Sequence, residues 1–344
     1  MKRWWKSLSV LLLCFGLVAM VACSQGAPSN VSTSTSGGGG SAGGGGSGGS
    51  SGGGGGGSAT AGGSSGQSGS AQPEQKFVLK LSHHQPPDHH HVIYGPVYFM
   101  DLVEKRTNGR VTFQHFPSEQ AGALKDQINL LQSGVVDIAV TSPAYASEKM
   151  PVGNAGSLPG WDLDPYGLGM AYFDVIKNPE SPFYKIDYQR HGLVPLWGGA
   201  ITPYQVVTKK KVTTMDDMKG LRLRSAGGTQ ELIISALGAV PVSMSSAEAY
   251  EAVERGTLDG LFFPLDSLFP WGLDAVIDNV TTNLQLTTFI VGYSISEQSF
   301  NKLPPDIRQI ILEAGAETAK YFGENMRNKH LDAIKQLAEQ GKGI

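Results

Sequence analysis

The chain has 344 residues and a formal net charge of −3 at pH 7, so it carries no strongly basic surface. No run of lysine or arginine is interleaved with aromatic residues, which excludes the usual sequence signature of nucleic-acid binding. The two cysteines, Cys14 and Cys23, both lie near the N-terminus. The sequence after them therefore excludes a zinc–thiolate site and a thiol nucleophile.

The first 22 residues have the pattern of an export signal. Three basic residues precede the apolar run 10–19, which is shorter than the roughly 20 apolar residues that a bilayer span needs. The small residues before Cys23 resemble the cleavage box of bacterial lipoproteins, in which the cysteine is acylated and becomes the new N-terminus. We expect residues 1–22 to be a lipoprotein signal peptide and Cys23 to anchor the protein by lipid at the periplasmic or extracytoplasmic face of a membrane. An uncleaved anchor is the alternative.

Residues 23–75 begin with this cysteine and continue almost entirely as glycine and serine. Such a segment gains little by packing, so we expect a disordered tether with a root-mean-square span of about 35–40 Å. The remaining sequence, from residue 76 onward, has the length of one large or two smaller domains.

Strands alternate with helices along this body, and no internal repeat is visible. In its first half we expect strands at 77–81, 110–115 and 135–140 and helices at 97–107 and 124–132. Farther along we expect strands at 193–197, 204–207, 220–224 and 258–263 and helices at 228–237 and 247–255. The alternation predicts an α/β fold.

A long helix is predicted at the C-terminus, at about 305–340. Pro304, Pro305 and Asp306 form a helix start, and apolar residues recur at helical spacing from Ile307 to Leu337. A helix of about 30 residues is roughly 45 Å long, enough to bridge two lobes.

Several segments resemble the substrate-binding subunit of tripartite ATP-independent periplasmic (TRAP) transporters, the DctP-like family. They are 79–84, 104–111, 130–138, 214–224, 236–242 and 249–260. The resemblance implies two α/β lobes that close over a ligand, joined by crossing strands and the long helix. Lobe I would comprise 76–199 and about 288–318, and lobe II 200–287.

The resemblance also implies a function. Members of this family capture a small organic carboxylate, hand it to the membrane permease subunits of the transporter and perform no chemistry, so no enzyme activity or cofactor is expected. They usually extend past the position of Ile344 with a further helical segment, which leaves truncation of this chain open.

Two arginines compete for the role of carboxylate anchor. The period of a strand places Arg222 and Arg224 on one face. By itself, a strand arginine is most often a solvated or ion-paired surface residue. Arg224, however, matches the family's near-invariant arginine, whose planar fork binds the ligand carboxylate, whereas Arg222 matches a peripheral position.

Other family positions predict a weakly polar site. Tyr204 stands where some relatives, including sialic-acid binders, have a second arginine, and Phe263 stands where they have an asparagine. Spacing places Ser142 and Tyr145 at ligand-facing positions that are ionisable in those relatives. We therefore expect a monocarboxylate with an apolar or aromatic body. An apolar wall would come from among Phe262, Phe263, Phe269 and Trp271, of which two or three are expected to be core residues.

The loop His83–His91 contains five histidines and leaves two interpretations open. One is an extracytoplasmic metal-binding lipoprotein, since imidazoles bind zinc, copper and nickel. The other, which we favour because the ligand spacing is undefined, is that His84 or His89 lines the ligand site. Phe262 and Phe263 replace the Glu-Trp pair that holds a cation in one family branch, so no metal is expected. A secreted α/β enzyme is a further alternative, but the body lacks a Gly-x-Ser-x-Gly elbow.

Overall fold

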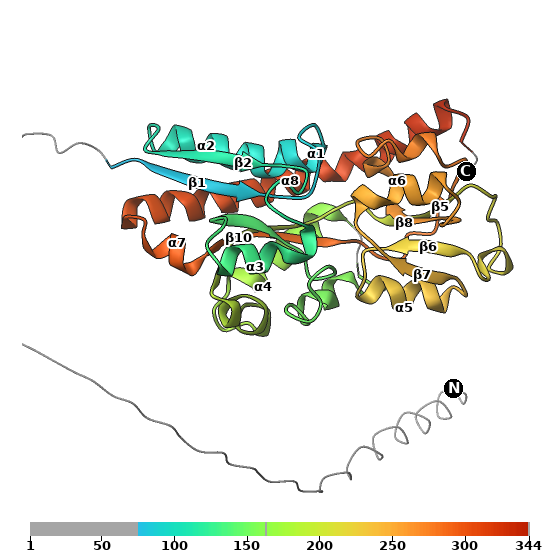
Figure 1. Cartoon of the computed structure of the whole chain (residues 1–344), viewed down its shortest axis with the longest axis horizontal. Coiled ribbons are helices and arrows are strands. Elements are labelled where there is room, and N and C mark those ends of the chain that lie inside the picture. The colour runs from blue at the N-terminus through green and yellow to red at the C-terminus, as the bar shows by residue number, and fades with distance from the viewer. Residues whose placement is uncertain (1–74, 162–163, 343–344) are drawn as a thin grey trace, which may run out of the picture. The chain divides into compact units, whose positions relative to one another are not determined.

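The computed structural model describes residues 75–161 and 164–342. The expected signal peptide, the lipidation site at Cys23 and almost all of the tether lie outside the described residues. The body contains two five-stranded sheets, ordered β2-β1-β3-β10-β4 and β7-β6-β8-β5-β9 (Figure 1). We call the first sheet with its helices lobe I and the second lobe II. The predicted two-lobed α/β fold is confirmed, whereas the residue boundaries of the lobes remain predictions.

The sheet of lobe I mixes parallel and antiparallel strands. Strand β1 pairs in parallel with β2 and β3, and β10 runs antiparallel to β3 and β4. The strands are β1 (Phe77–Ser82), β2 (Val111–Phe116), β3 (Ile138–Thr141), β4 (Leu193–Ala200) and β10 (Ile290–Ser296). Our sequence analysis did not predict β10, and it began β3 three residues too early, since residues 135–137 are irregular and follow the turn at 133–134.

Lobe I carries its helices on both sides of the sheet. They are α1 (His90–Val92), the π-helical η1 (Ile93–Val97), α2 (Tyr98–Arg106), η2 (Leu124–Asp126), α3 (Gln127–Gln132), η3 (Gly153–Ser157), α4 (Pro165–Lys177), η4 (Phe183–Tyr188), η5 (Gln189–His191) and α7 (Glu297–Asn301). The helix expected to start at residue 97 starts at His90 instead. Pro96 lies inside the π turn, which accommodates a residue without an N–H, and the side chain of His89 accepts the amide of His91 as an N-cap.

Lobe II repeats the βα pattern. Strand β6 runs parallel to β7 and β8, and β5 runs antiparallel to β8 and β9. The elements are β5 (Tyr204–Thr208), η6 (Asp216–Met218), β6 (Arg222–Ser225), α5 (Thr229–Ala236), β7 (Val240–Ser243), α6 (Ser246–Glu254), β8 (Gly260–Pro264), η7 (Leu265–Ser267), η8 (Leu273–Ala275) and β9 (Asn279–Val280). A capping box of Ser245 and Glu248 starts α6 at the cavity described below.

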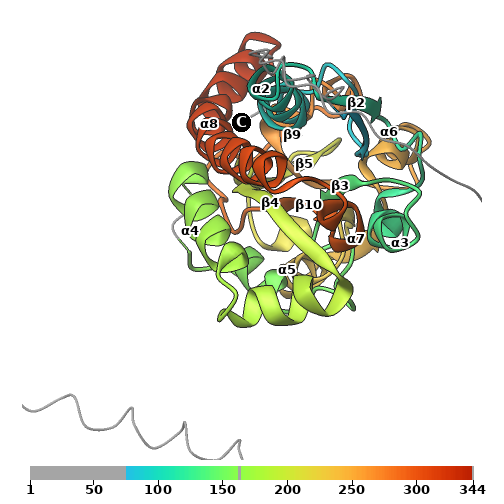
Figure 2. The ribbon, with the colours of Figure 1, turned by 90° about the vertical axis from the view of Figure 1, so that its left-hand side faces the viewer.

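The long helix α8 (Pro305–Glu339) confirms the predicted lobe-bridging element. It packs against α2, α4 and β4 of lobe I (Figure 2). It also packs against η7 of lobe II. Its buried side chains enter the cores of both lobes, from Ile307 at one end to Leu337 at the other. Gly315 permits the close approach to β4, because a Cβ there would lie 2.1 Å from the carbonyl oxygen of Leu196. None of the described helices is both long and apolar enough to cross a membrane.

Candidate functional site

A cavity lies between the lobes, where loops from both sheets meet α8. The empty space between its walls measures ≈ 590 Å³ when the part open to solvent is included, but the room for the centre of a water-sized sphere is only ≈ 40 Å³, so the cavity is narrow in this conformation. The loop after β1 and strands β4 and β10 contribute from lobe I, and β5, α6 and the segment after β8 from lobe II. Aromatic rings dominate the walls: Trp197, Tyr204, Phe263, Trp271, Phe289 and Phe322.

Arg224 is a fully buried arginine at the edge of this cavity. Its Nε–H donates to the backbone oxygen of Met244 (3.0 Å), and its Nη2 donates to the hydroxyls of Ser246 (3.3 Å) and Tyr145. Its Nη1 has no hydrogen-bond partner among the described residues, and no carboxylate of that part of the chain forms an ion pair with it. Burying a cation without a directly bound carboxylate is costly.

The arginine lies behind the cavity wall rather than on it. Tyr145, Ser246 and Phe263 line the cavity, and Arg224 itself does not. Its Cζ is 5.1 Å from the centre of the Phe263 ring and 5.9 Å from that of Tyr145, within cation–π range. These side chains therefore separate the guanidinium from the cavity.

Arg222 differs sharply from Arg224 although they share a strand face. Its side chain is 45% exposed, and its Nε and Nη2 donate to the two carboxylate oxygens of Asp259 at 3.1 Å each. Arg222 is therefore an ion-paired surface residue, as most strand arginines are.

Most of the site residues expected from the sequence line the cavity. His84, His89, Tyr145, Tyr204 and Phe263 do so, and burial raises the pKa of the Tyr204 phenol, which stays protonated and able to donate.

Two expected groups lie elsewhere. Ser142 is buried, is not part of the cavity wall, and its hydroxyl has no hydrogen-bond partner among the described residues. Of the four aromatics considered for an apolar wall, Phe262 and Phe269 pack in the lobe II cores, whereas Phe263 and Trp271 line the cavity.

The sequence analysis missed several wall residues, above all Trp197, Phe289 and Phe322. Strand β4, the segment before β10 and helix α8 deliver them from distant parts of the chain. Ser246 had a local signal, because it is the first residue of a helix with a capping-box sequence.

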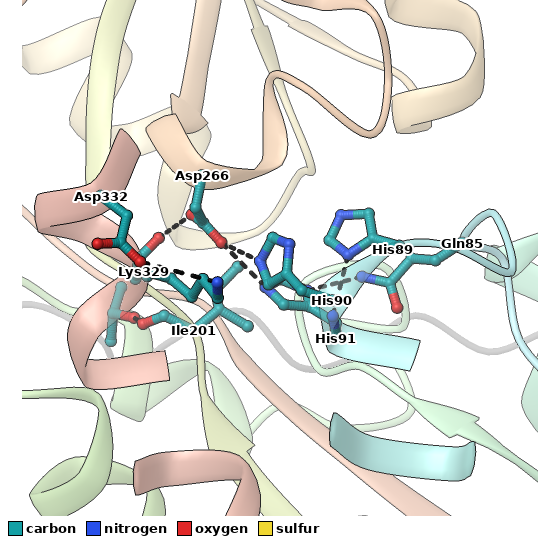
Figure 3. Close-up of polar contacts among 10 residues, drawn as sticks. Gln85, His89, His90, His91, Ile201, Asp266, Lys329 and Asp332 are labelled. Atoms are coloured by element: carbon teal, nitrogen blue, oxygen red, sulfur yellow. Dashed lines mark hydrogen bonds and ion pairs between the residues drawn. The ribbon is translucent and has the colours of Figure 1, made fainter. Parts of the chain in front are cut away.

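The histidine loop reaches lobe II through Asp266, a buried carboxylate of η7. The Nε2 of His90 is hydrogen-bonded to its Oδ2, and the Nε2 of His91 lies 3.4 Å from the same oxygen (Figure 3). Thr202 donates its hydroxyl to the other carboxylate oxygen. Burial, with repulsion from His90, lowers the pKa of His91 to about 4. Burial raises the pKa of Asp266, but the two histidines outweigh it and hold that pKa well below its usual range.

Residues 81–344 match the model of a protein family described as bacterial extracellular solute-binding protein, family 7 (DctP). A relative from Rhodobacter capsulatus, the C4-dicarboxylate-binding periplasmic protein DctP, is 25% identical over 259 residues, which cover 72% of this chain and 73% of that protein.

Two solved structures share the fold. A TRAP periplasmic solute-binding protein from Bordetella bronchiseptica with bound (R)- and (S)-mandelate has a TM-score of 0.69 and 25% identity, over 78% of this chain and 84% of that one. A TRAP solute-binding protein from Rhodoferax ferrireducens in complex with copurified benzoate has a TM-score of 0.71 and 23% identity, over 78% and 83%. The chain therefore belongs to the DctP family of extracellular solute-binding proteins, the substrate-binding subunits of TRAP transporters, which are not enzymes.

Proposed function

We propose that this protein captures a small monocarboxylate with an apolar or aromatic body in the cavity between its lobes and delivers it to a TRAP permease. The observation that carries the proposal is Arg224, a buried guanidinium that lacks a carboxylate partner among the described residues and stands behind an aromatic cavity. A ligand carboxylate would supply the missing negative charge, and its hydrogen bonds to the guanidinium would be of the strong, charge-assisted kind.

In this proposal the neighbouring side chains orient the carboxylate. The hydroxyl of Tyr145 already accepts from Arg224, and the protonated phenol of Tyr204 lines the same cavity. His84 and His89 face the ligand from the loop after β1, where the ring of His84 stacks with Trp271 at a centroid distance of 6.4 Å.

The walls favour an apolar ligand body. A second carboxylate or several sugar hydroxyls would be desolvated against the rings of Phe263 and Trp271, at a cost of roughly 1–3 kcal/mol for each unpaired group. Apolar area placed there instead contributes about 25 cal/mol per Å². The benzoate and mandelate bound by the two structural relatives fit this chemistry, whereas the Rhodobacter relative is named for dicarboxylates.

Calorimetric titration with benzoate, succinate and galacturonate tests the ligand class. We expect benzoate to bind at least 10-fold more tightly than the other two. If succinate or galacturonate bound most tightly, the proposed ligand class would be wrong, but the family assignment would be unaffected.

We also propose that lipid on Cys23 tethers the protein to the membrane, on the strength of the cleavage-box resemblance. Cys23→Ala should abolish acylation and leave a soluble or uncleaved species, detected by cell fractionation and intact mass. Cys14→Ala is the matched control and should leave processing unchanged. Unaltered processing and membrane association of Cys23→Ala would refute the tether.

A further inference from the structure

We propose that His90, His91 and Asp266, with His89 as a fourth ligand, form a binding site for one divalent transition-metal ion of the Zn²⁺ class. The site would connect the two lobes, because the histidines follow β1 in lobe I and Asp266 follows β8 in lobe II. It reverses our sequence-based expectation that no metal is bound.

The three histidines lie close together, and Asp266 lies beside two of them, His90 and His91. The Nε2 atoms of His90 and His91 both approach Oδ2 of Asp266, where a metal ion would replace a shared proton (Figure 3). One ring nitrogen from each of the three consecutive histidines lies within 4.8 Å of the others. Ligand nitrogens of a tetrahedral zinc site are roughly 3.3 Å apart, so small side-chain rotations would complete the coordination.

Unpartnered atoms support a missing ligand. His89 and His91 are buried, and the Nε2 of each has no hydrogen-bond partner among the described residues. The three rings also crowd together, with centroids 4.4–4.5 Å apart. The Nε2 of His91 has only the 3.4 Å contact with Asp266, and packing alone does not account for the unsatisfied Nε2 of His89, because a buried polar atom costs about 1–3 kcal/mol when left without a partner.

The surrounding groups can adapt to the ion. The Nδ1 of His91 lies 2.8 Å from the side-chain amide of Gln85, which can turn its oxygen to this ring and fix the metal-binding tautomer. The Nδ1 of His89 accepts the backbone amide of His91. An imidazole bound to a metal through Nε2 carries its proton on Nδ1, so His89 would have to release this cap when the metal binds. Imidazole and carboxylate donors without thiolates suit Zn²⁺, Ni²⁺ or Cu²⁺ better than Ca²⁺ or Mg²⁺.

The test is a competition titration of Zn²⁺ against a chromophoric chelator, using the full chain without a polyhistidine tag after metal removal. We expect one Zn²⁺ per chain and at least 100-fold weaker binding of Ca²⁺. Both His90→Gln and Asp266→Asn should weaken Zn²⁺ binding at least 10-fold.

His115→Gln is the matched control, because His115 pairs with His83 in the same lobe but outside the cluster. It should keep wild-type Zn²⁺ affinity, as should Arg224→Lys, so the metal site and the proposed carboxylate site can fail independently. The melting temperature checks that each variant is folded, and benzoate titration serves as a second check for every variant except Arg224→Lys. No Zn²⁺ binding by the wild type, or a loss in His115→Gln but not in His90→Gln, would overturn the proposal.

Discussion

Replacing Arg224 by lysine keeps the positive charge but removes the planar set of guanidinium N–H donors. The guanidinium of Arg224 uses Nε and Nη2 for Met244, Tyr145 and Ser246, and its Nη1 has no hydrogen-bond partner in the described part of the chain. A lysine ammonium has no rigid second donor with which to hold the protein contacts and a carboxylate at once. The variant therefore loses at least one charge-assisted hydrogen bond to the ligand.

A hydrogen bond to a charged group is worth about 1.5–3 kcal/mol. Arg224→Lys should therefore raise the benzoate Kd by roughly 10- to 150-fold, since each 1.4 kcal/mol is a factor of ten. Calorimetry on the variant and the wild type measures the ratio, and the melting temperature shows whether the buried lysine also destabilises lobe II.

Arg222→Lys is the matched control on the same strand. Arg222 is exposed and bound to Asp259, and exposed ion pairs contribute only about 0–1 kcal/mol. Its benzoate affinity should stay within about 2-fold of wild type. An unchanged Kd in a folded Arg224→Lys protein, or a larger loss in Arg222→Lys, would show that Arg224 does not anchor the carboxylate.

Three further expectations concern packing, charge and selectivity. Gly315→Ala should lower the free energy of unfolding by about 1–3 kcal/mol in denaturant titrations, because the new Cβ would meet the Leu196 carbonyl; an unchanged stability would contradict the close contact. The bond from Arg327 lowers the pKa of Asp164 to about 2, so the stability from this pair should be full above the unfolded pKa near 4 and vanish as the pH falls through 2. At pH 6, Asp164→Asn should have a free energy of unfolding lower than wild type by on the order of 1 kcal/mol, a value that allows for the partial exposure of the pair. A stability difference that persists at pH 2 would show that it does not come from the ion pair. Phe263→Asn should narrow the preference for benzoate over succinate, and a preserved ratio in the folded variant would make Phe263 a core residue only.

Local patterns predicted the elements well where periodicity and caps agreed. The helix at 124–132 and the long C-terminal helix matched α3 with η2 and α8. Helix α4 was missed although Asp164 caps it and Pro165 occupies its first turn. Its glycines weaken helix propensity, and Gly169 is there for packing, because a Cβ would lie 2.9 Å from the backbone nitrogen of Ala200.

The site was predictable only where the family resemblance supplied positions. That resemblance pointed to Arg224 and Tyr145, two residues that meet across the lobes although they are 79 positions apart. Nothing local could show that Phe322 reaches the cavity from α8, or that His90 meets Asp266 over a separation of 176 residues. The prediction that Ser142 faces the ligand site failed, since Ser142 does not line the cavity. Spacing along a loop does not determine which way a side chain points.

The most direct test of the account is a crystal structure of the protein with bound benzoate. We expect the carboxylate to lie within hydrogen-bond distance of Nη1 of Arg224 and the ring to lie between Phe263 and Trp271 in the cavity between the lobes. A benzoate bound elsewhere, or a carboxylate held without Arg224, would contradict the central claim.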